Sequence, residues 1–589
     1  TFTASSASPV YTGTSGSVTI GASPATKFVI TGSGTQTAGV SQNLTITATD
    51  ASGNTDPSYT GDKTLTFSGA NSSTNPVTLP TVEDKTGAAV AFGTATTITF
   101  TSGVATVSAG NNGVMMLYKV ETANIVATQG AITTSGADRL TVVVSASGMN
   151  KFVLSLTSPQ VNGVAFTGAN TLTAQDVYGN TVTSYSAATN NVTIAAVSPL
   201  TGAISGLSGV NKLTGAGDFV LGVANLTTLG MKYTGNTAAG TFTASSASPV
   251  YNGTSGSVTI NAGAATKFVI TGSGTQTAGV SQNLTITATD ASGNTDPSYT
   301  GDKTLTFSGA NSSTNPVTLP TVEDKTGAAV AFGTATTITF TSGVATVSAG
   351  NNGVMMLYKV ETANIVATQG AITTSGADRL TVVVSASGMN KFVLSLTSPQ
   401  VNGAVFTGTN TLTAQDAYGN TVNFDASANN VTIAAVSPLT GAISGLSGVN
   451  KLTAAGDFVG GVANLTTLGM KYTGNATTGT FTASSASPVY TGTSGSVNIN
   501  GGAFTKMQLL VPGETAAPGT VSGKTGTPTA QVAGTSFSVT VNAVDANWNV
   551  VSSTDVVGIT SSDVNAALPA SAAMVAGTQT FSVTLKTVG

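Results

Sequence analysis

The sequence predicts an all-β protein made of tandem β-sandwich domains in an extended array. Three observations support this fold class: a composition with few charges and many small and β-branched residues, short segments in which apolar and polar residues alternate, and internal repeats of two lengths. At 589 residues the chain is also longer than one hydrophobic core usually serves, so several domains are expected.

The composition favours folded β-structure over disorder. Charged residues make up only 7% of the chain, against about 25% in an average soluble protein. Segments such as 43–50 (NLTITATD) and 138–144 (DRLTVVV) are nevertheless rich in β-branched residues, which pack well on a pleated, half-buried surface. The chain contains no Cys, so each domain must be held by its own core rather than by disulfides.

The second observation is a period of two residues within these segments. In 43–50 the alternation puts Leu44, Ile46 and Ala48 on one face of a strand. The threonines between them, the last of which is Thr49, lie on the other face. We therefore expect strands with one face in a core and one in water, and almost no helix.

The third observation is a long, nearly identical repeat. The segment TFTASSASPVY begins at residues 1, 241 and 480, which gives periods of 240 (241 − 1) and 239 (480 − 241) residues. Repeats this similar indicate recent duplication, which is common in surface and fibre proteins whose length depends on copy number.

A shorter and more divergent repeat lies inside the long one. A strand, a turn that contains Asp, and an Asn recur five times, as in TATDASGN (47–54) and TAQDVYGN (173–180). Upstream of each turn a segment such as KFVI (27–30) or KMQL (506–509) is expected to be the opening strand. The turn aromatics Tyr178 and Trp548 are expected to cap the end of their own sandwich.

The five markers define the expected domain organisation. The last domain carries an inserted Gly- and Pro-rich stretch at 513–531, which is expected to be a loop. The expected segments are two closing strands at 1–22 that belong to a preceding or neighbouring domain, domains at 23–147, 148–262, 263–387 and 388–502, and a fifth domain at 503–589 that lacks its last two strands.

These strand and turn patterns resemble bacterial immunoglobulin-like repeats. The resemblance rests on KFV, on the strand that ends in TATDASGN, on Tyr59 in DPSYTG, and on closing strands such as GVATVSAG (103–110). Repeats of this family build invasin- and intimin-like stalks and giant surface adhesins. The resemblance implies immunoglobulin-like sandwiches used as spacers or fibre segments, an extracellular or cell-surface location and a bacterial source. The resemblance assigns no functional role to any residue of this chain.

The two ends of the sequence carry complementary fragments of a sandwich. Residues 1–20 match the last two strands of the second domain (240–260), and the fifth domain stops after VTLK, which corresponds to LGMK. Either a longer protein has been cropped, or residues 1–20 of one subunit complete the fifth domain of the next by strand addition, which would build a filament. The residues expected to pair in the second case are Thr14, Val18 and Ile20 with Phe581, Val583 and Leu585.

The residue types also exclude several functions. The chain has no His and no Cys, which removes the usual catalytic bases, nucleophiles and metal ligands, so we expect no enzyme. The 19 Lys and Arg residues are scattered singly, which excludes a basic surface for nucleic acid. No apolar run is long enough to insert into a membrane.

One weak cofactor candidate remains. The turn after Asp50 carries several side-chain oxygens and resembles part of a calcium loop, although it lacks the closing bidentate Glu. Asp and Asn before Gly are also ordinary turn formers, and a turn is the expected role. The candidate calcium residues are Asp50, Asn54, Asp56, Asp290, Asn294 and Asp296.

The sequence therefore predicts a structural or adhesive extracellular fibre, or a cell-surface filament subunit that associates with itself. A glycan or a host-cell surface ligand is a further possible partner. The alternative is a stalk of spacer or carbohydrate-binding modules in a larger secreted enzyme or adhesin. Carbohydrate-binding modules display clustered aromatics, and this chain has a single Trp.

Overall fold

The structure is a computed structural model that describes residues 1–589. It is all-β, as predicted: its only helical segments are two single 3-10 turns, η1(Gly136–Asp138) and η2(Gly376–Asp378). No helix is long and apolar enough to cross a membrane. The chain divides into two compact units, Thr1–Ala265 with Thr289–Asp296, and Thr266–Ala288 with Pro297–Gly589.

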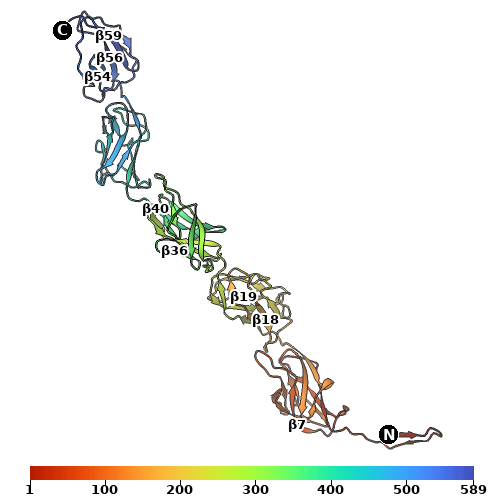
Figure 1. Cartoon of the computed structure of the whole chain (residues 1–589). Coiled ribbons are helices and arrows are strands. Elements are labelled where there is room, and N and C mark those ends of the chain that lie inside the picture. Colours follow the sequence, from red (N-terminus) through yellow and green to blue (C-terminus); the bar gives the residue numbers. More distant parts are fainter. The chain divides into compact units, whose positions relative to one another are not determined.

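The first domain is a sandwich whose principal sheets have the strand orders β10-β7-β13-β15-β4 and β11-β6-β3. Figure 1 labels β7 in this domain. A third sheet, β5-β12-β8-β9, completes it. The strands are β3(Lys27–Thr31), β4(Thr35–Thr37), β5(Gln42–Asn43), β6(Thr45–Thr49), β7(Gly61–Ser68), β8(Thr81–Glu83), β9(Ala89–Ala91), β10(Ala95–Phe100), β11(Val104–Thr106), β12(Val114–Met116), β13(Thr122–Gln129), β14(Ile132–Thr133) and β15(Leu140–Ser145).

The core of the first domain follows the predicted alternation. Leu44, Ile46 and Ala48 are all at most 1% exposed, and the Phe28 and Phe100 rings stack 6.0 Å apart between the sheets. Thr49 was expected to face water and is buried instead. Thr49 ends β6 and pairs with Lys27 at the start of β3, and the backbone N–H of Thr26 donates a hydrogen bond to the Thr49 carbonyl.

The second domain has a different set of strands. Its sheets are β16-β18-β22, β21-β19-β25-β26, β17-β27-β24 and β20-β23, and they enclose a core of its own. The strands are β16(Lys151–Ser155), β17(Gln160–Val161), β18(Thr171–Gln175), β19(Val192–Ala196), β20(Ala203–Ser205), β21(Lys212–Leu213), β22(Val223–Asn225), β23(Lys232–Thr234), β24(Ala239–Gly240), β25(Phe242–Ser246), β26(Asn252–Thr254) and β27(Val258–Asn261).

The third and fourth domains repeat the first two. Strands β28(Lys267–Thr271) to β40(Leu380–Ser385) follow β3 to β15 at a distance of 240 residues (267 − 27). The fourth domain has the sheets β41-β43-β47, β46-β44-β50-β51, β42-β52-β49 and β45-β48. Its strands are β41(Lys391–Ser395), β42(Gln400–Val401), β43(Thr411–Gln415), β44(Val431–Ala435), β45(Ala442–Ser444), β46(Lys451–Leu452), β47(Val462–Asn464), β48(Lys471–Thr473), β49(Thr478–Gly479), β50(Phe481–Ser485), β51(Thr491–Thr493) and β52(Val497–Asn500).

The fifth domain has fewer strands. One sheet is β53-β56-β59, and two further pairs are β54-β55 and β57-β58. The pair β54-β55 forms a hairpin in the stretch that was expected to be a loop. The strands are β53(Lys506–Leu510), β54(Glu514–Ala516), β55(Lys524–Gly526), β56(Ser536–Val544), β57(Val556–Val557), β58(Ala572–Ala573) and β59(Thr578–Thr584).

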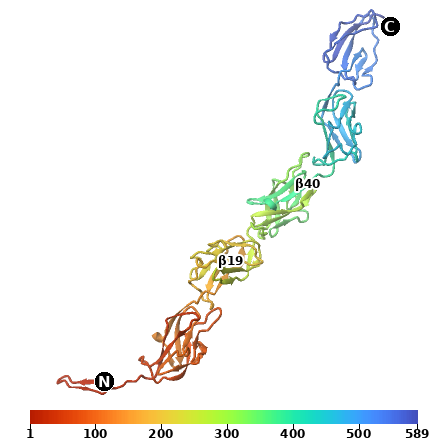
Figure 2. The same ribbon diagram turned by 180° about the vertical axis from the view of Figure 1, so that it is seen from behind.

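The first residues form a separate hairpin. Strands β1(Thr3–Ser5) and β2(Thr12–Thr14) pair with each other and with no other strand (Figure 2). Every residue from Thr1 to Ile20 is exposed. This segment is therefore a β-hairpin with no core beneath it.

Candidate functional site: the domain junctions and the open end of the fifth domain

The five repeated Asp residues form turns, as predicted. In each, one carboxylate oxygen accepts hydrogen bonds from the backbone N–H groups two and four residues on. Asp545 Oδ1 accepts from Asn547 at 2.8 Å and from Asn549 at 2.9 Å. This arrangement closes a tight turn with the Asp side chain in place of a backbone carbonyl.

The second carboxylate oxygen holds the linker that enters the same domain. Asp176 Oδ2 accepts a hydrogen bond from the Ser147 backbone at 3.0 Å, and Asp545 Oδ2 accepts one from the Gly502 backbone at 2.8 Å. Each Asp thus fixes both its own turn and the chain segment that arrives from the preceding domain.

The Asn at the end of the turn joins consecutive domains. In the first unit, Asn180 Nδ2 donates to the Tyr118 carbonyl at 2.8 Å, and the Val120 backbone N–H donates to Asn180 Oδ1 at 2.8 Å. Asn420 makes the same pair of bonds with Tyr358 and Val360 in the second unit. One Asn side chain therefore pairs with the preceding domain as a short strand would.

The junctions that follow the second and fourth domains carry an additional Asn. Asn402 Nδ2 donates to Asp545 Oδ2 at 2.8 Å, and Asn402 Oδ1 accepts from the Gly474 backbone at 2.8 Å. Asn549 Nδ2 donates to the Gly474 carbonyl at 2.8 Å. In the first unit Asn162 and Asp290 form the same contact at 2.7 Å. These side chains are almost fully buried.

An aromatic contact closes the other type of junction. The Tyr178 ring lies 5.0 Å from the Tyr118 ring of the first domain. Gly39 has a φ of +76°, which favours glycine, and the Tyr178 hydroxyl occupies the space that a Cβ at this position would take. Tyr178 was expected to cap its own sandwich. It packs against the preceding domain instead, because the turn lies at the junction.

Hydrogen bonding keeps the junction carboxylates charged. Burial acts to raise the pKa of Asp545, but hydrogen bonds from Asn549, Gly502 and Asn402 outweigh it and hold the pKa below its ordinary value of 3.8. The pKa of Asp416 is lowered against the effect of burial in the same way, chiefly by Asn420 and the Ser387 backbone. A neutral carboxyl would lose acceptor capacity at the centre of the junction.

These pKa shifts predict acid sensitivity of the fourth-to-fifth junction. A carboxyl whose folded pKa is depressed adds stability above its unfolded pKa and loses it as the pH falls through the folded pKa. Denaturant unfolding followed by Trp548, the single Trp, is expected to keep its midpoint from pH 7 to about pH 5 and to decline below about pH 4. The Asp545→Asn variant should show a shallower decline, and an equal decline in both proteins would contradict this assignment.

The carboxylates of the calcium candidates accept hydrogen bonds from backbone N–H groups. Asp50 Oδ1 accepts from the backbones of Ser52 and Asn54, and Asp50 Oδ2 accepts from Ser23. Asp56 accepts from the backbones of Ser58 and Ala25, and the Ala265 backbone donates to Asp296. N–H donors point at these oxygens where calcium would need free lone pairs. Asp290 and Asn294 bond to Asn162 and to the Gly235 carbonyl.

The first copy of the turn differs from the later ones. The Asn54 amide bonds to Asp50, and its side chain is exposed. Asn549, at the same place in the fifth domain, is only 2% exposed because it contacts the fourth domain. The Asn54 side chain therefore bonds within its own turn.

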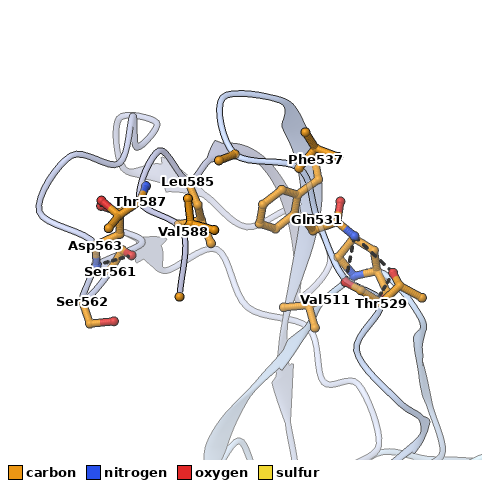
Figure 3. A pocket seen from close by; sticks show the side chains of 14 residues that line it. Val511, Thr529, Gln531, Phe537, Ser561, Ser562, Asp563, Leu585, Thr587 and Val588 are labelled. Atoms are coloured by element: carbon orange, nitrogen blue, oxygen red, sulfur yellow. Dashed lines mark hydrogen bonds between the residues drawn. The ribbon is translucent and has the colours of Figure 1, made fainter.

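The fifth domain has fewer strands than the fourth and holds a cavity. The fourth domain contains the four-stranded sheet β46-β44-β50-β51, whereas no sheet of the fifth has more than three strands. A cavity of about 600 Å³ lies in the fifth domain beside the last residues of the sequence. Figure 3 shows Leu585 and Val588 on one side of it and Phe537 and Val511 on the other.

The predicted pairing residues lie in two settings. Thr14 ends β2, and Val18 and Ile20 are 54% and 84% exposed. Phe581 and Val583 belong to β59 and are buried in the core of the fifth domain, while Leu585 is partly buried and lines the cavity. Their pairing stays a prediction. In the second and fourth domains the strands that match β1, which are β25 and β50, pair with β19 and β44. The strands that match residues 18–20, which are β27 and β52, pair with β17 and β24 and with β42 and β49.

Comparisons with known proteins yield structural similarity alone. No protein-family model matches the chain, and no curated protein matches it. Among solved structures, domains 4–9 of the surface layer protein SbsC match at 16% identity and a TM-score of 0.17, over 91% of this chain and 85% of that one. The ICAM-5 D1–D4 ectodomain fragment matches at 10% identity and a TM-score of 0.19, over 80% and 100% of the two chains.

A third solved structure is also similar at low sequence identity and a low TM-score. A putative membrane anchored protein from Corynebacterium diphtheriae matches at 11% identity and a TM-score of 0.14, over 61% of this chain and 89% of that one. Similarities at these levels carry no argument about activity or partners. The chain is thus characterised by its own structure, as tandem β-sandwich domains joined by repeated side-chain hydrogen bonds.

Proposed function

We propose that the chain is a structural segment of an extracellular, cell-surface fibre of bacterial origin. The observation that supports this function best is the repeated junction. Buried Asp and Asn side chains join each domain to the next within each unit. A fibre that transmits force needs such fixed contacts between its domains, whereas modules that act independently do not. The 7% charge content adds little repulsion between neighbouring fibres.

Two further features fit a structural role. The exposed large side chains are mostly single valines, and they include only Phe2, Tyr11 and Phe504 among the aromatics, which supports a structural role rather than sugar stacking. No group of three or more metal-ligating side chains gathers in the structure. The function needs neither a catalytic site nor a cofactor, and the chain's principal partner is another copy of itself.

Immunogold electron microscopy of intact cells, with antibodies against the recombinant chain, tests the proposal. The expected result is labelling along filaments that extend from the cell surface. Labelling confined to short stalks that end in another domain would favour the spacer function instead. Labelling inside the cell would exclude both.

A further inference from the structure

We propose that Tyr118 and Tyr178, and their repeats Tyr358 and Tyr418, are sites of oxidative cross-linking that join consecutive domains by a carbon–carbon bond. The modification is a dityrosine within one chain, and the co-reactant is a one-electron oxidant. The inference goes beyond the proposed fibre function and rests on it only for the extracellular setting in which oxidants reach the chain.

The two rings of the first pair come from different domains and lie in contact. Tyr118 follows β12 of the first domain, and Tyr178 lies in the Asp turn of the second. Their ring centroids are 5.0 Å apart, and the ring planes are inclined by 60°. This distance is at the short end of the range for packed aromatic pairs. Radicals formed on the two rings are therefore close enough to couple.

The second unit repeats the pair. The rings of Tyr358 and Tyr418 also lie 5.0 Å apart, with planes inclined by 56°. Other tyrosines have different neighbours: Tyr59 and Tyr185 pack against Phe rings of their own domains. Contact between two tyrosine rings thus marks the junctions that follow the first and third domains.

Hydrogen bonds hold both residues of the pair in place. Asn180 Nδ2 donates to the Tyr118 carbonyl across the junction at 2.8 Å. The Tyr178 backbone N–H donates to Asp176 Oδ1 at 2.9 Å, and the Tyr118 hydroxyl donates to Met116 Sδ at 2.9 Å. A reaction between two groups that are already held together avoids the entropic cost of bringing them into contact. The junction itself therefore favours coupling of these two rings.

The rings are open to a small oxidant in solution. Tyr118, Tyr178, Tyr358 and Tyr418 are all partly exposed. Burial raises the pKa of Tyr178, and the nearby Tyr118 and Asp176 raise it further, so this phenol is protonated at neutral pH and gives up a proton with its electron. The chain has 12 Tyr and no Cys, so it can form no disulfide, and tyrosine coupling is an oxidative cross-link that its composition allows.

The reaction balances as a two-electron oxidation. Each phenol loses one electron to the oxidant and one proton to water, which leaves two tyrosyl radicals. The radicals join through ring carbons ortho to the hydroxyl groups, and one carbon–carbon bond forms. The hydrogen on each joined carbon then moves to the phenol oxygen, which restores two aromatic rings. The chain loses two hydrogen atoms in total, and the oxidant takes up two electrons.

The cross-link would strengthen the junction type that has fewer buried side-chain contacts. The additional residues Asn162 and Asn402 belong to the other junction type. A bond from Tyr118 to Tyr178 closes a loop of 61 residues (178 − 118 + 1). Closing a loop restricts the unfolded chain and so stabilises the folded junction.

Oxidation of the purified 589-residue chain tests the inference. The oxidant is light-activated tris(bipyridyl)ruthenium(II) with persulfate, applied to a dilute solution in which chains seldom meet. Dityrosine fluorescence is expected to appear in chains that still migrate as monomers. Mass spectrometry of a protease digest should find the peptide of Tyr118 joined to that of Tyr178, two hydrogen atoms lighter than their sum.

Phenylalanine variants separate coupling from packing, because Phe keeps the ring and loses only the hydroxyl. Tyr178→Phe should lower the dityrosine fluorescence to about half, since one of the two pairs remains. Tyr178→Phe combined with Tyr418→Phe should abolish it. Tyr185→Phe is the control: the fourth domain already has Phe424 in the same ring cluster, and this variant should keep the full signal.

Three results would overturn the inference. They are a chain that forms no dityrosine under these conditions, cross-links that occur only between chains, and equal fluorescence in the unmodified chain and in the Tyr178→Phe, Tyr418→Phe double variant.

This inference and the fibre function can fail separately. Dityrosine at the Tyr118–Tyr178 contact without labelling at the cell surface would keep the cross-linking site and remove the extracellular role. Filament labelling on cells together with a chain that forms no dityrosine would keep the fibre function and remove the cross-linking site.

Discussion

Replacement of Phe481 by Ala is expected to unfold the fourth domain selectively, at a cost of about 3–5 kcal/mol. The side chain is fully buried, and its ring contacts Phe406 at 5.9 Å and Tyr472 at 5.8 Å. Removing it leaves a cavity that the strands of two sheets cannot collapse to fill. Calorimetry should show one transition lowered by on the order of 10–20 °C.

The matched control is Phe2→Ala in the identical local sequence TFTASS. Phe2 has no core around it in a single chain, so its loss should leave every unfolding transition of the monomer in place. A large effect of Phe2→Ala on a dilute, monomeric sample would show that the hairpin already packs within its own chain.

Replacement of Asn549 by Ala is expected to destabilise the fifth domain by about 2–4 kcal/mol, because two buried backbone groups of the fourth domain lose their partner. Those groups are the Gly474 carbonyl and the Ala476 backbone N–H. Denaturant unfolding followed by Trp548 fluorescence measures the change. Asn54→Ala is the control: this Asn is exposed and bonds only within its own turn, so its loss should cost up to about 1 kcal/mol. An equal loss of unfolding free energy in the Asn549→Ala and Asn54→Ala variants would contradict the junction role of Asn549.

Most of the fold could be predicted because local patterns determine it. The alternation in 43–50 and the opening strands that begin at Lys27 and Lys506 appear in the structure as expected. The hairpin β54-β55 was missed, because its residues are rich in Gly, Pro and Thr and show no apolar alternation.

The junctions could be predicted only in part. The Asp turns were found because an Asp side chain bonds to its own neighbours in sequence. Asn402 and Tyr178 were not assigned to junctions, because their partners lie far away in the chain: Asn402 meets Asp545, and Tyr178 meets Tyr118. The only available signal for Asn402 was its position before Gly403, which is equally typical of an ordinary turn.

The alternation of two junction types has an evolutionary consequence. Tyr118 and Asn180 make one type, Asn162 and Asp290 the other, and all four residues lie within 173 positions (290 − 118 + 1). Duplication of a two-domain unit copies both halves of each interface at once, so a longer chain needs no new complementary surface. Duplication of one domain alone would place the turn that contains Tyr178 and Asn180 against a domain surface that has no counterpart of Tyr118. Recombination can therefore lengthen or shorten this protein in steps of two domains, and no new contact residues have to be selected at the junctions.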